Sequence, residues 1–219
     1  LFASEIDWSV LAIIAEHPQF TTGATGFAGP VLTPQQMESL ATADLMAGDA
    51  ATAETAEAIG LRPVTQSVRR GQPALSVGRY LDENPTDLVV VDSPHLAGDL
   101  VDDGIVPVLV MPSSGVKPTD GPVLLAIDES PLDDVVTSSA TRLFDPLTTN
   151  FVTVHVEAPD PASGILATAQ QRDASMIVLG THNRGWLSRL FQPSVADAVL
   201  QHTQRPVLLM SAPDDSNTR

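Results

Sequence analysis

The chain carries one pattern of apolar segments twice, and this repetition constrains its fold more than any other feature of the sequence. Three pairs of similar segments occur in the same order in both halves: "VLAIIAEHP" (10–18) with "FVTVHVEAP" (151–159), "TDLVVVDSPH" (86–95) with "ASMIVLGTHN" (174–183), and "VPVLVMPSS" (106–114) with "RPVLLMSAP" (205–213). Two long copies indicate two related domains in tandem, and not a solenoid of short repeats.

A segment rich in proline, glycine and serine separates the two copies, and it ends in "PTDGP" (118–122). Such composition marks a connection between patterned regions. We therefore predict four parts: a first domain over residues 1–114, a linker over 115–121, a second domain over 122–213, and a tail over 214–219.

Each copy alternates short apolar runs with segments of helical periodicity. The run "PVLLAID" (122–128) is continuously apolar, as in a strand buried on both faces, and residues 132–144 have apolar positions at helical spacing. Aromatic residues are only 4% of the chain, so its core must be aliphatic. These features predict an α/β fold with two doubly wound domains, each a mainly parallel sheet flanked by helices.

The two copies differ in the segments that they contain. The first copy lacks counterparts of a first strand and most of a first helix. It has instead an alanine-rich helix over about 34–59 and a short strand near 64–68, which the second copy lacks. We therefore expect at least one sheet to be abbreviated.

Composition argues against several classes of function. The formal net charge of −16, from 27 acidic and 11 basic residues, repels nucleic acids and anionic membranes. The absence of cysteine excludes disulfides and thiolate chemistry. No apolar run approaches the ~18 residues of a membrane helix. We expect a cytoplasmic protein that binds neither nucleic acid nor membrane.

Catalytic and metal-binding patterns do not stand out either. The histidines are scattered without the spacing of metal ligands, and we expect His155, within a strand, to be packed. No G-x-S-x-G nucleophile motif is present. We therefore predict no catalytic residue and no metal site.

The second copy resembles the universal stress protein family. The resemblance covers "PVLLAIDES" (122–130), "VTVHVEAP" (152–159) and the stretch from "SMIVLGTHNRGWLSRLF" to "RPVLLM" (175–210), while the first copy is similar more loosely. It implies five-stranded sheets of the adenine-nucleotide alpha-hydrolase type. Ligands of such sheets bind at the carboxyl ends of the strands, where the strand order reverses.

The resemblance also implies the position of a nucleotide site. Members that bind ATP carry the motif G-x2-G-x9-G-[ST] after the fourth strand, and an Asp at the end of the first. Gly180 and Ser194 match the motif, and Asp128 matches the Asp. Glycines allow the backbone to approach phosphates, and amides at a helix N-terminus donate hydrogen bonds to them.

Two motif positions depart from the family pattern. Asn183 replaces the second glycine, but Asn can adopt left-handed conformations. Pro193 replaces the third glycine and has no amide hydrogen, although proline is well suited to the start of a helix. The loss of one charged hydrogen bond costs about 1.5–3 kcal/mol, or roughly ten- to a hundredfold in affinity.

Neighbouring side chains complete the predicted site. Arg184 could compensate for the lost donor, and His182 follows the strand closely enough to line the site. The residues that we assign to nucleotide binding are Asp128, Gly180, His182, Asn183, Arg184 and Ser194. No cofactor is firmly implied, and ATP would bind weakly or not at all.

The first copy is expected to bind no nucleotide. Asp92 stands where the second copy has Gly180, so a carboxylate would repel a triphosphate. The segment from Asp92 to Pro107 is also about eleven residues shorter than its counterpart, which leaves little room for a phosphate loop.

Three functions remain open on these grounds. The preferred one is a non-enzymatic stress-response regulator or scaffold that has a degraded nucleotide site and an unidentified protein partner. The alternatives are an ATP-binding stress sensor with slow hydrolysis and a cytoplasmic regulatory module of a transporter. We expect the two copies to form an internal pseudo-dimer in which residues 105–111 pair with 205–211, hiding two apolar edges. A homodimer of such tandem chains is a further option.

Overall fold

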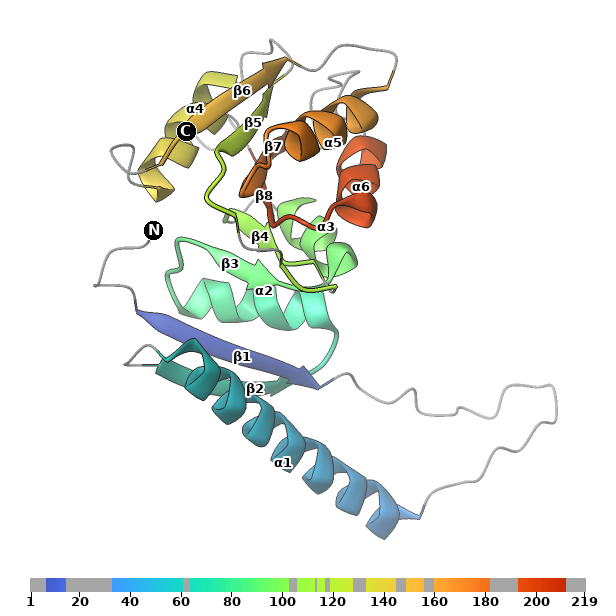
Figure 1. Cartoon of the computed structure of the whole chain (residues 1–219). Coiled ribbons are helices and arrows are strands. Elements are labelled where there is room, and N and C mark those ends of the chain that lie inside the picture. Colours follow the sequence, from blue (N-terminus) through green and yellow to red (C-terminus); the bar gives the residue numbers. More distant parts are fainter. Residues whose placement is uncertain are drawn as a thin grey trace, which may run out of the picture. The chain divides into compact units, whose positions relative to one another are not determined.

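The computed structural model describes most of the chain (Figure 1). The described residues are 7–14, 33–60, 64–102, 106–112, 114–116, 119–127, 133–144, 149–155, 160–181 and 193–211. The strands are β1 (Trp8–Ile14), β2 (Val64–Arg70), β3 (Val89–Val91), β4 (Val108–Val110), β5 (Val123–Ile127), β6 (Phe151–His155), β7 (Met176–Thr181) and β8 (Val207–Ser211). The helices are α1 (Pro34–Ile59), α2 (Pro73–Glu83), α3 (Pro94–Asp102), α4 (Asp133–Leu143), α5 (Pro161–Gln171) and α6 (Pro193–His202).

The chain forms two compact units, Ala3–Tyr80 and Leu81–Arg219, and the division falls within α2. In the first unit, β1 and β2 form a parallel pair, with register from Trp8↔Val64 to Ile14↔Arg70, and α1 connects them. α1 lies close to these strands because Gly48 has no side chain: a Cβ there would lie 2.9 Å from Cγ1 of Val68.

Local signals determine both ends of α1. The hydroxyl of Thr33 accepts a hydrogen bond from the amide of Gln36 (3.3 Å), and the side chain of Gln36 accepts one from the amide of Thr33 (2.8 Å). This capping box satisfies two backbone donors at the helix start. Gly60 ends the helix in a left-handed conformation with φ of 66°. The predicted helix over 34–59 is therefore confirmed.

The second unit contains a six-stranded sheet in the order β3-β4-β8-β7-β5-β6. Neighbouring strands are parallel except for β4 and β8, which are antiparallel. In Figure 1, α5 and α6 lie side by side along the sheet with α3 next to α6, and α4 lies apart from them. The expected α/β fold with a mainly parallel sheet flanked by helices is confirmed.

The central strands of this sheet are buried on both faces. On one face, Leu125, Val178 and Leu208 pack against a cluster that includes Val136 and Phe144, from α4 and the residue after it. The residues that alternate with them along the strands are equally inaccessible: Leu124, Ile177, Leu179, Val207 and Leu209. Continuous aliphatic runs such as "VLLAI" therefore reflect helices on both sides of a parallel sheet.

The two copies build their last strand pairs in the same register. Val89 pairs with Val108 in the first copy, and Ile177 pairs with Val207 at the corresponding positions of the second. The hydrogen bonds that begin the two ladders also correspond, since the amides of Val89 and Ile177 each donate to the carbonyl of a proline at 3.0 Å, Pro107 and Pro206.

The predicted contact between residues 105–111 and 205–211 is confirmed. β4 and β8 pair antiparallel, and the middle pair is Leu109↔Leu208. These two leucines occupy equivalent positions in the two copies. The pairing therefore has an approximate local two-fold symmetry, as in an isologous interface.

Other expectations need correction or stay predictions. The described six-stranded sheet contains β5, β6, β7 and β8 from the second copy and β3 and β4 from the first. Among the described strands, the abbreviated form of the prediction therefore applies, and the form with two five-stranded sheets does not. α2 and α3 were not predicted. The domain boundaries at 114 and 122 remain a prediction, because the compact units divide elsewhere and β4 completes the sheet of the second copy. No helix in the described part of the chain is long and apolar enough to cross a membrane.

Candidate functional site

The strand order of the large sheet reverses at β5, which lies between β6 and β7. All three strands are parallel, and Ala126 of β5 is in register with Leu179 of β7. The positions that follow, Ile127 and Gly180, therefore lie at the same edge of the sheet. Ligands of open α/β sheets bind at such a reversal, beyond the carboxyl ends of the strands.

Gly180 lies at this edge, near the end of β7, and it packs directly against α4. A Cβ at this position would lie 2.7 Å from Cγ2 of Val136, which is shorter than side-chain contacts allow. Helix packing is therefore a sufficient reason for the glycine, without a phosphate nearby. The sequence reasoning missed this reason because Val136 lies on another element.

The other predicted site residues are only partly visible. Asp128, His182, Asn183 and Arg184 lie outside the described residues. Ser194 is the second residue of α6, directly after Pro193, which begins the helix. The structure thus places Gly180 at the reversal point and Ser194 at a helix start, and it leaves the grouping of the six residues as a prediction.

Pro193 has a counterpart in the first copy. α3 begins at Pro94 and α6 begins at Pro193, and the two prolines are 99 positions apart, as are the paired leucines 109 and 208. Proline at the first helical position needs no amide partner and already has helical φ. The same helix start therefore occurs in a copy that was predicted to bind nothing.

The first copy leaves no stretch for a loop at this point. α3 begins two residues after Asp92, and the hydroxyl of Ser93 accepts a hydrogen bond from the amide of Leu96 at 3.3 Å. Asp92 itself is exposed, directly after the end of β3. The chain turns directly from β3 into the helix, in line with the shortened segment expected from the sequence.

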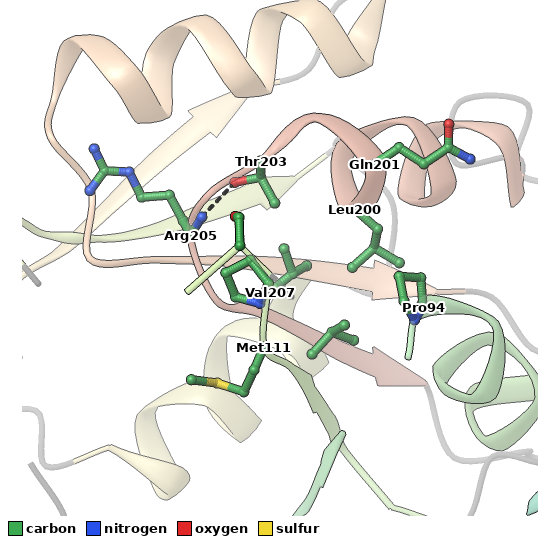
Figure 2. A pocket seen from close by; sticks show the side chains of 10 residues that line it. Pro94, Met111, Leu200, Gln201, Thr203, Arg205 and Val207 are labelled. Atoms are coloured by element: carbon green, nitrogen blue, oxygen red, sulfur yellow. Dashed lines mark hydrogen bonds between the residues drawn. The ribbon is translucent and has the colours of Figure 1, made fainter. Parts of the chain in front are cut away.

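A cavity of about 220 Å³ opens where the two copies meet, next to β4 and β8 (Figure 2). It is smaller than the roughly 300–1,000 Å³ of most ligand pockets. The backbone amide of Arg205 donates to the hydroxyl of Thr203 at 3.0 Å, and its guanidinium group extends away from the cavity in Figure 2. The lining residues are Pro94, Val110, Met111, Pro112, Ser114, Leu200, Gln201, Thr203, Arg205 and Val207.

The guanidinium group of Arg205 has partners outside this cavity. It donates to a carboxylate oxygen of Asp173 at 2.7 Å and to the carbonyl of Ala174. The cavity lining thus offers hydroxyl and amide groups but no uncompensated positive charge. A nucleotide phosphate would not be neutralised there, so the cavity is a poorer candidate than the reversal point.

The described ionisable groups also show no catalytic arrangement. Hydrogen bonds from the side chain and the backbone of Ser163 hold the pKa of Asp160 below its usual value, which is the effect of a helix cap at the start of α5. His155 lies in β6 but is exposed, so the expectation that it is packed was wrong. Within the described ranges, no three His, Asp or Glu side chains gather as metal ligands would.

Comparison with known proteins finds a similarity in the second copy. The family profile of the universal stress proteins matches residues 146–211, which run from before β6 to the end of β8 and include Gly180 and α6. Over this segment, which is less than half of the chain, the second copy is similar to the universal stress protein family. A search of curated proteins gives no significant match.

Solved structures resemble the fold of this chain beyond the matched segment. A universal stress protein from Archaeoglobus fulgidus DSM 4304 superposes with a TM-score of 0.63 at 15% identity, covering 96% of this chain and 88% of that one. A functionally unknown protein from Pseudomonas aeruginosa PAO1 gives a TM-score of 0.52 at 17% identity, with coverage of 97% and 95%. At these identities the likeness concerns the fold alone.

Proposed function

We propose that this protein is a stress-response regulator or scaffold in which the nucleotide site of the second copy has degenerated. On this proposal it acts in the cytoplasm by binding a protein partner and catalyses no reaction. The match of residues 146–211 to the universal stress protein profile supports the role in stress response. The degenerate site is a separate step, and it is supported by the residues at the strand reversal.

The start of α6 is the observation that carries the proposal. The first amides of a helix point outward and together bind anions. Pro193 occupies the first helical position and supplies no amide, so the cradle has one donor fewer. Since Pro94 begins α3 in the same way, the proline is explained by helix initiation.

An ATP-binding sensor remains the second candidate, because Gly180 lies at the reversal point where a nucleotide would be expected. In this proposal Asp128 would contact the adenosine, and Arg184 would replace the lost donor. The packing of Val136 against Gly180 weakens the argument, because it accounts for the glycine in another way.

Bound nucleotide distinguishes the two candidates directly. The purified protein is denatured, and the supernatant is separated by ion-exchange chromatography with ATP, ADP and AMP as standards. We expect no nucleotide in a fixed ratio to protein. One nucleotide per chain would overturn the regulator with a degenerate site and establish the sensor.

Restoration of the motif tests the physical reason. We expect the double variant Asn183→Gly, Pro193→Gly to bind ATP about ten- to a hundredfold more tightly than the natural chain in titration calorimetry, because a backbone donor returns. Pro94→Gly is the matched control, since it changes the same helix position in the first copy and should leave affinity unchanged. If the double variant folds but gains no affinity, the missing amide is not the cause of weak binding.

A further inference from the structure

The pairing of β4 with β8 ends beside the cavity shown in Figure 2. Its last register pair is Val110↔Val207, and both residues line the cavity. The next position would place Met111 opposite Pro206, which has no amide to extend the ladder. The amide of Met111 donates instead to the carbonyl of Val91 in β3, at 2.7 Å. The cavity therefore lies where the strands of the two copies stop pairing.

Both copies contribute equally to this cavity. Half of its ten lining residues come from the first copy and half from the second, and all belong to the compact unit that contains the six-stranded sheet. Val110 and Val207 are buried and form its inner end, whereas Ser114 and Gln201 are exposed and lie at its rim. A molecule bound here would contact both copies at once.

The equivalent methionines at the two ends of the ladder are packed differently. Met210 remains in β8, in register with Gly180, and is only 2% exposed. Its counterpart in the first copy, Met111, has left β4, is half-buried and lines the cavity. Pairing of the copies is thus compatible with a closed methionine position, so the opening at Met111 is a separate property of this end.

The charges around the cavity restrict what it can hold. Arg205 is the only ionisable residue among those that line it, and its guanidinium group is bound by Asp173 and by the carbonyl of Ala174. A charged molecule would lose hydration on entering and gain no opposite charge in return. The lining therefore favours an uncharged ligand.

The polar groups of the lining are few, and Thr203 is the best placed among them. Its hydroxyl accepts a hydrogen bond from the backbone amide of Arg205 at 3.0 Å (Figure 2). A hydroxyl can donate as well as accept, so Thr203 still has a proton to give to an oxygen in the cavity. The walls nearby are apolar and include Leu200, Pro94 and Val207.

The volume of the cavity limits the size of its ligand. At about 220 Å³ it is somewhat larger than an engineered apolar cavity of about 150 Å³ that binds benzene. It therefore has room for a molecule of roughly six to ten non-hydrogen atoms.

We propose that this cavity binds a small uncharged molecule with an apolar body and one hydroxyl or carbonyl oxygen, and that the bound molecule stabilises the pairing of the two copies. The apolar body would lie against Val110, Val207 and Leu200, and its oxygen would accept from Thr203. A few polar groups in a mainly apolar cleft are typical of ligand sites. The inference does not depend on whether the second copy binds a nucleotide.

Benzyl alcohol is a suitable probe, because it combines an aromatic ring with one hydroxyl in about eight non-hydrogen atoms. In NMR titration of the full chain, we expect saturable shifts at the amides of Met111, Leu200, Thr203 and Val207, with a dissociation constant in the millimolar range. Benzoate, which has the same ring and a carboxylate, should bind at least about tenfold more weakly.

Substitutions of Thr203 test the polar contact. Thr203→Val removes the hydroxyl and keeps the shape, so benzyl alcohol should bind about three- to tenfold more weakly. Toluene, which has no oxygen, should bind the variant within about twofold of the natural chain, and this comparison separates the lost hydrogen bond from a change in the fold. Thr203→Ser retains the hydroxyl and should retain most of the affinity for benzyl alcohol.

A larger side chain at Leu200 tests the place of binding. Leu200 is half-buried, so Leu200→Phe should fold while it occupies part of the cavity, and both probes should bind at least about tenfold more weakly. Gln204→Phe is the matched control. It adds the same side chain at an exposed position that does not line the cavity, and should leave affinity unchanged.

Hydrogen exchange tests the effect on the two copies. At a benzyl alcohol concentration of twice the dissociation constant, the amides of β4 and β8 should exchange about threefold more slowly, because the ligand binds only the paired form. Leu200→Phe should show no such slowing. Slower exchange in one of the two strands alone would overturn the stabilisation of the pairing.

Three other results would contradict the binding site. They are the absence of saturable shifts up to about 20 mM benzyl alcohol, which would mean that the cavity holds water alone, unchanged affinity of Leu200→Phe, and binding of benzoate as tight as that of benzyl alcohol. The last result would show that the lining does not select against charge.

Discussion

Gly180 illustrates how one residue can satisfy a motif for a reason that the motif does not contain. Its place in the family pattern associates it with phosphate, while the structure gives it a contact with α4. A glycine that allows a helix to approach a strand is needed whether or not a ligand is bound. The two roles predict different consequences when a single methyl group is added.

We expect Gly180→Ala to lower the free energy of unfolding by about 1–3 kcal/mol, the usual cost of overpacking. The new Cβ would lie 2.7 Å from Cγ2 of Val136, and a β-branched side chain has little freedom to turn away. Urea denaturation in the absence of nucleotide measures the effect.

The double variant Gly180→Ala, Val136→Ala tests whether the contact is the cause. Because the second change makes room for the first, the double variant should lose less stability than the sum of the two single variants. Unchanged stability of Gly180→Ala would assign the glycine to ligand binding in place of helix packing.

At the scale of elements, the end of the predicted linker is tightly packed against the turn between α5 and β7. A Cβ on Gly121 would lie 1.8 Å from the carbonyl oxygen of Asp173. The hydroxyl of Thr119 lies within hydrogen-bonding distance of that carbonyl (2.9 Å) and of the Asp173 carboxylate (2.8 Å), which also pairs with Arg205. This end of the connection is therefore part of the fold.

We expect Gly121→Ala to destabilise the protein by about 3 kcal/mol or more, at the upper end of overpacking, because backbone atoms cannot give way as side chains do. Gly164→Ala is the matched control. Gly164 lies within α5 with no atom near its added Cβ, so the change should stabilise by about 0.5–1 kcal/mol. Equal stabilities of the two variants in urea denaturation would show that the linker moves freely.

Elements with local signals were predictable from the sequence, and elements that depend on distant contacts were not. The alanine-rich segment of α1 and the continuous apolar run of β5 are local, and both predicted elements were confirmed. α2 and α3 were missed although prolines begin both helices, at positions that match Pro161 and Pro193 of the second copy. Comparison of these prolines between the copies would have found them.

The candidate site was less predictable than the fold. A motif specifies residue types along the chain, but the contact of Gly180 with Val136 depends on how α4 lies across β7. Four of the six predicted residues also lie outside the described part of the chain, so their grouping stays a prediction. What the structure adds is a packing reason for one residue and a helix-start reason for its neighbour in the motif, Pro193.

At the scale of the molecule, one sheet passes through both copies. β4 of the first copy and β8 of the second pair through Leu109 and Leu208, and both leucines belong to one buried cluster with Leu125 and Val178. A sheet that shares its core in this way should unfold cooperatively. The second copy, which alone matches the family profile, should therefore depend on a strand of the first.

We expect Leu109→Ala to lower the free energy of unfolding by about 2–5 kcal/mol, because it leaves a cavity in this shared cluster. The amides of β7 should lose protection from hydrogen exchange together with those of β3 and β4, although the change lies in the first copy. Leu45→Ala on α1 is the control: its side chain is 41% exposed and lies in the other compact unit, so β7 should keep its protection. If Leu109→Ala weakens β3 and β4 alone, the two copies are independent folding units joined at an edge, and the pairing of β4 with β8 is an interface and not a shared core.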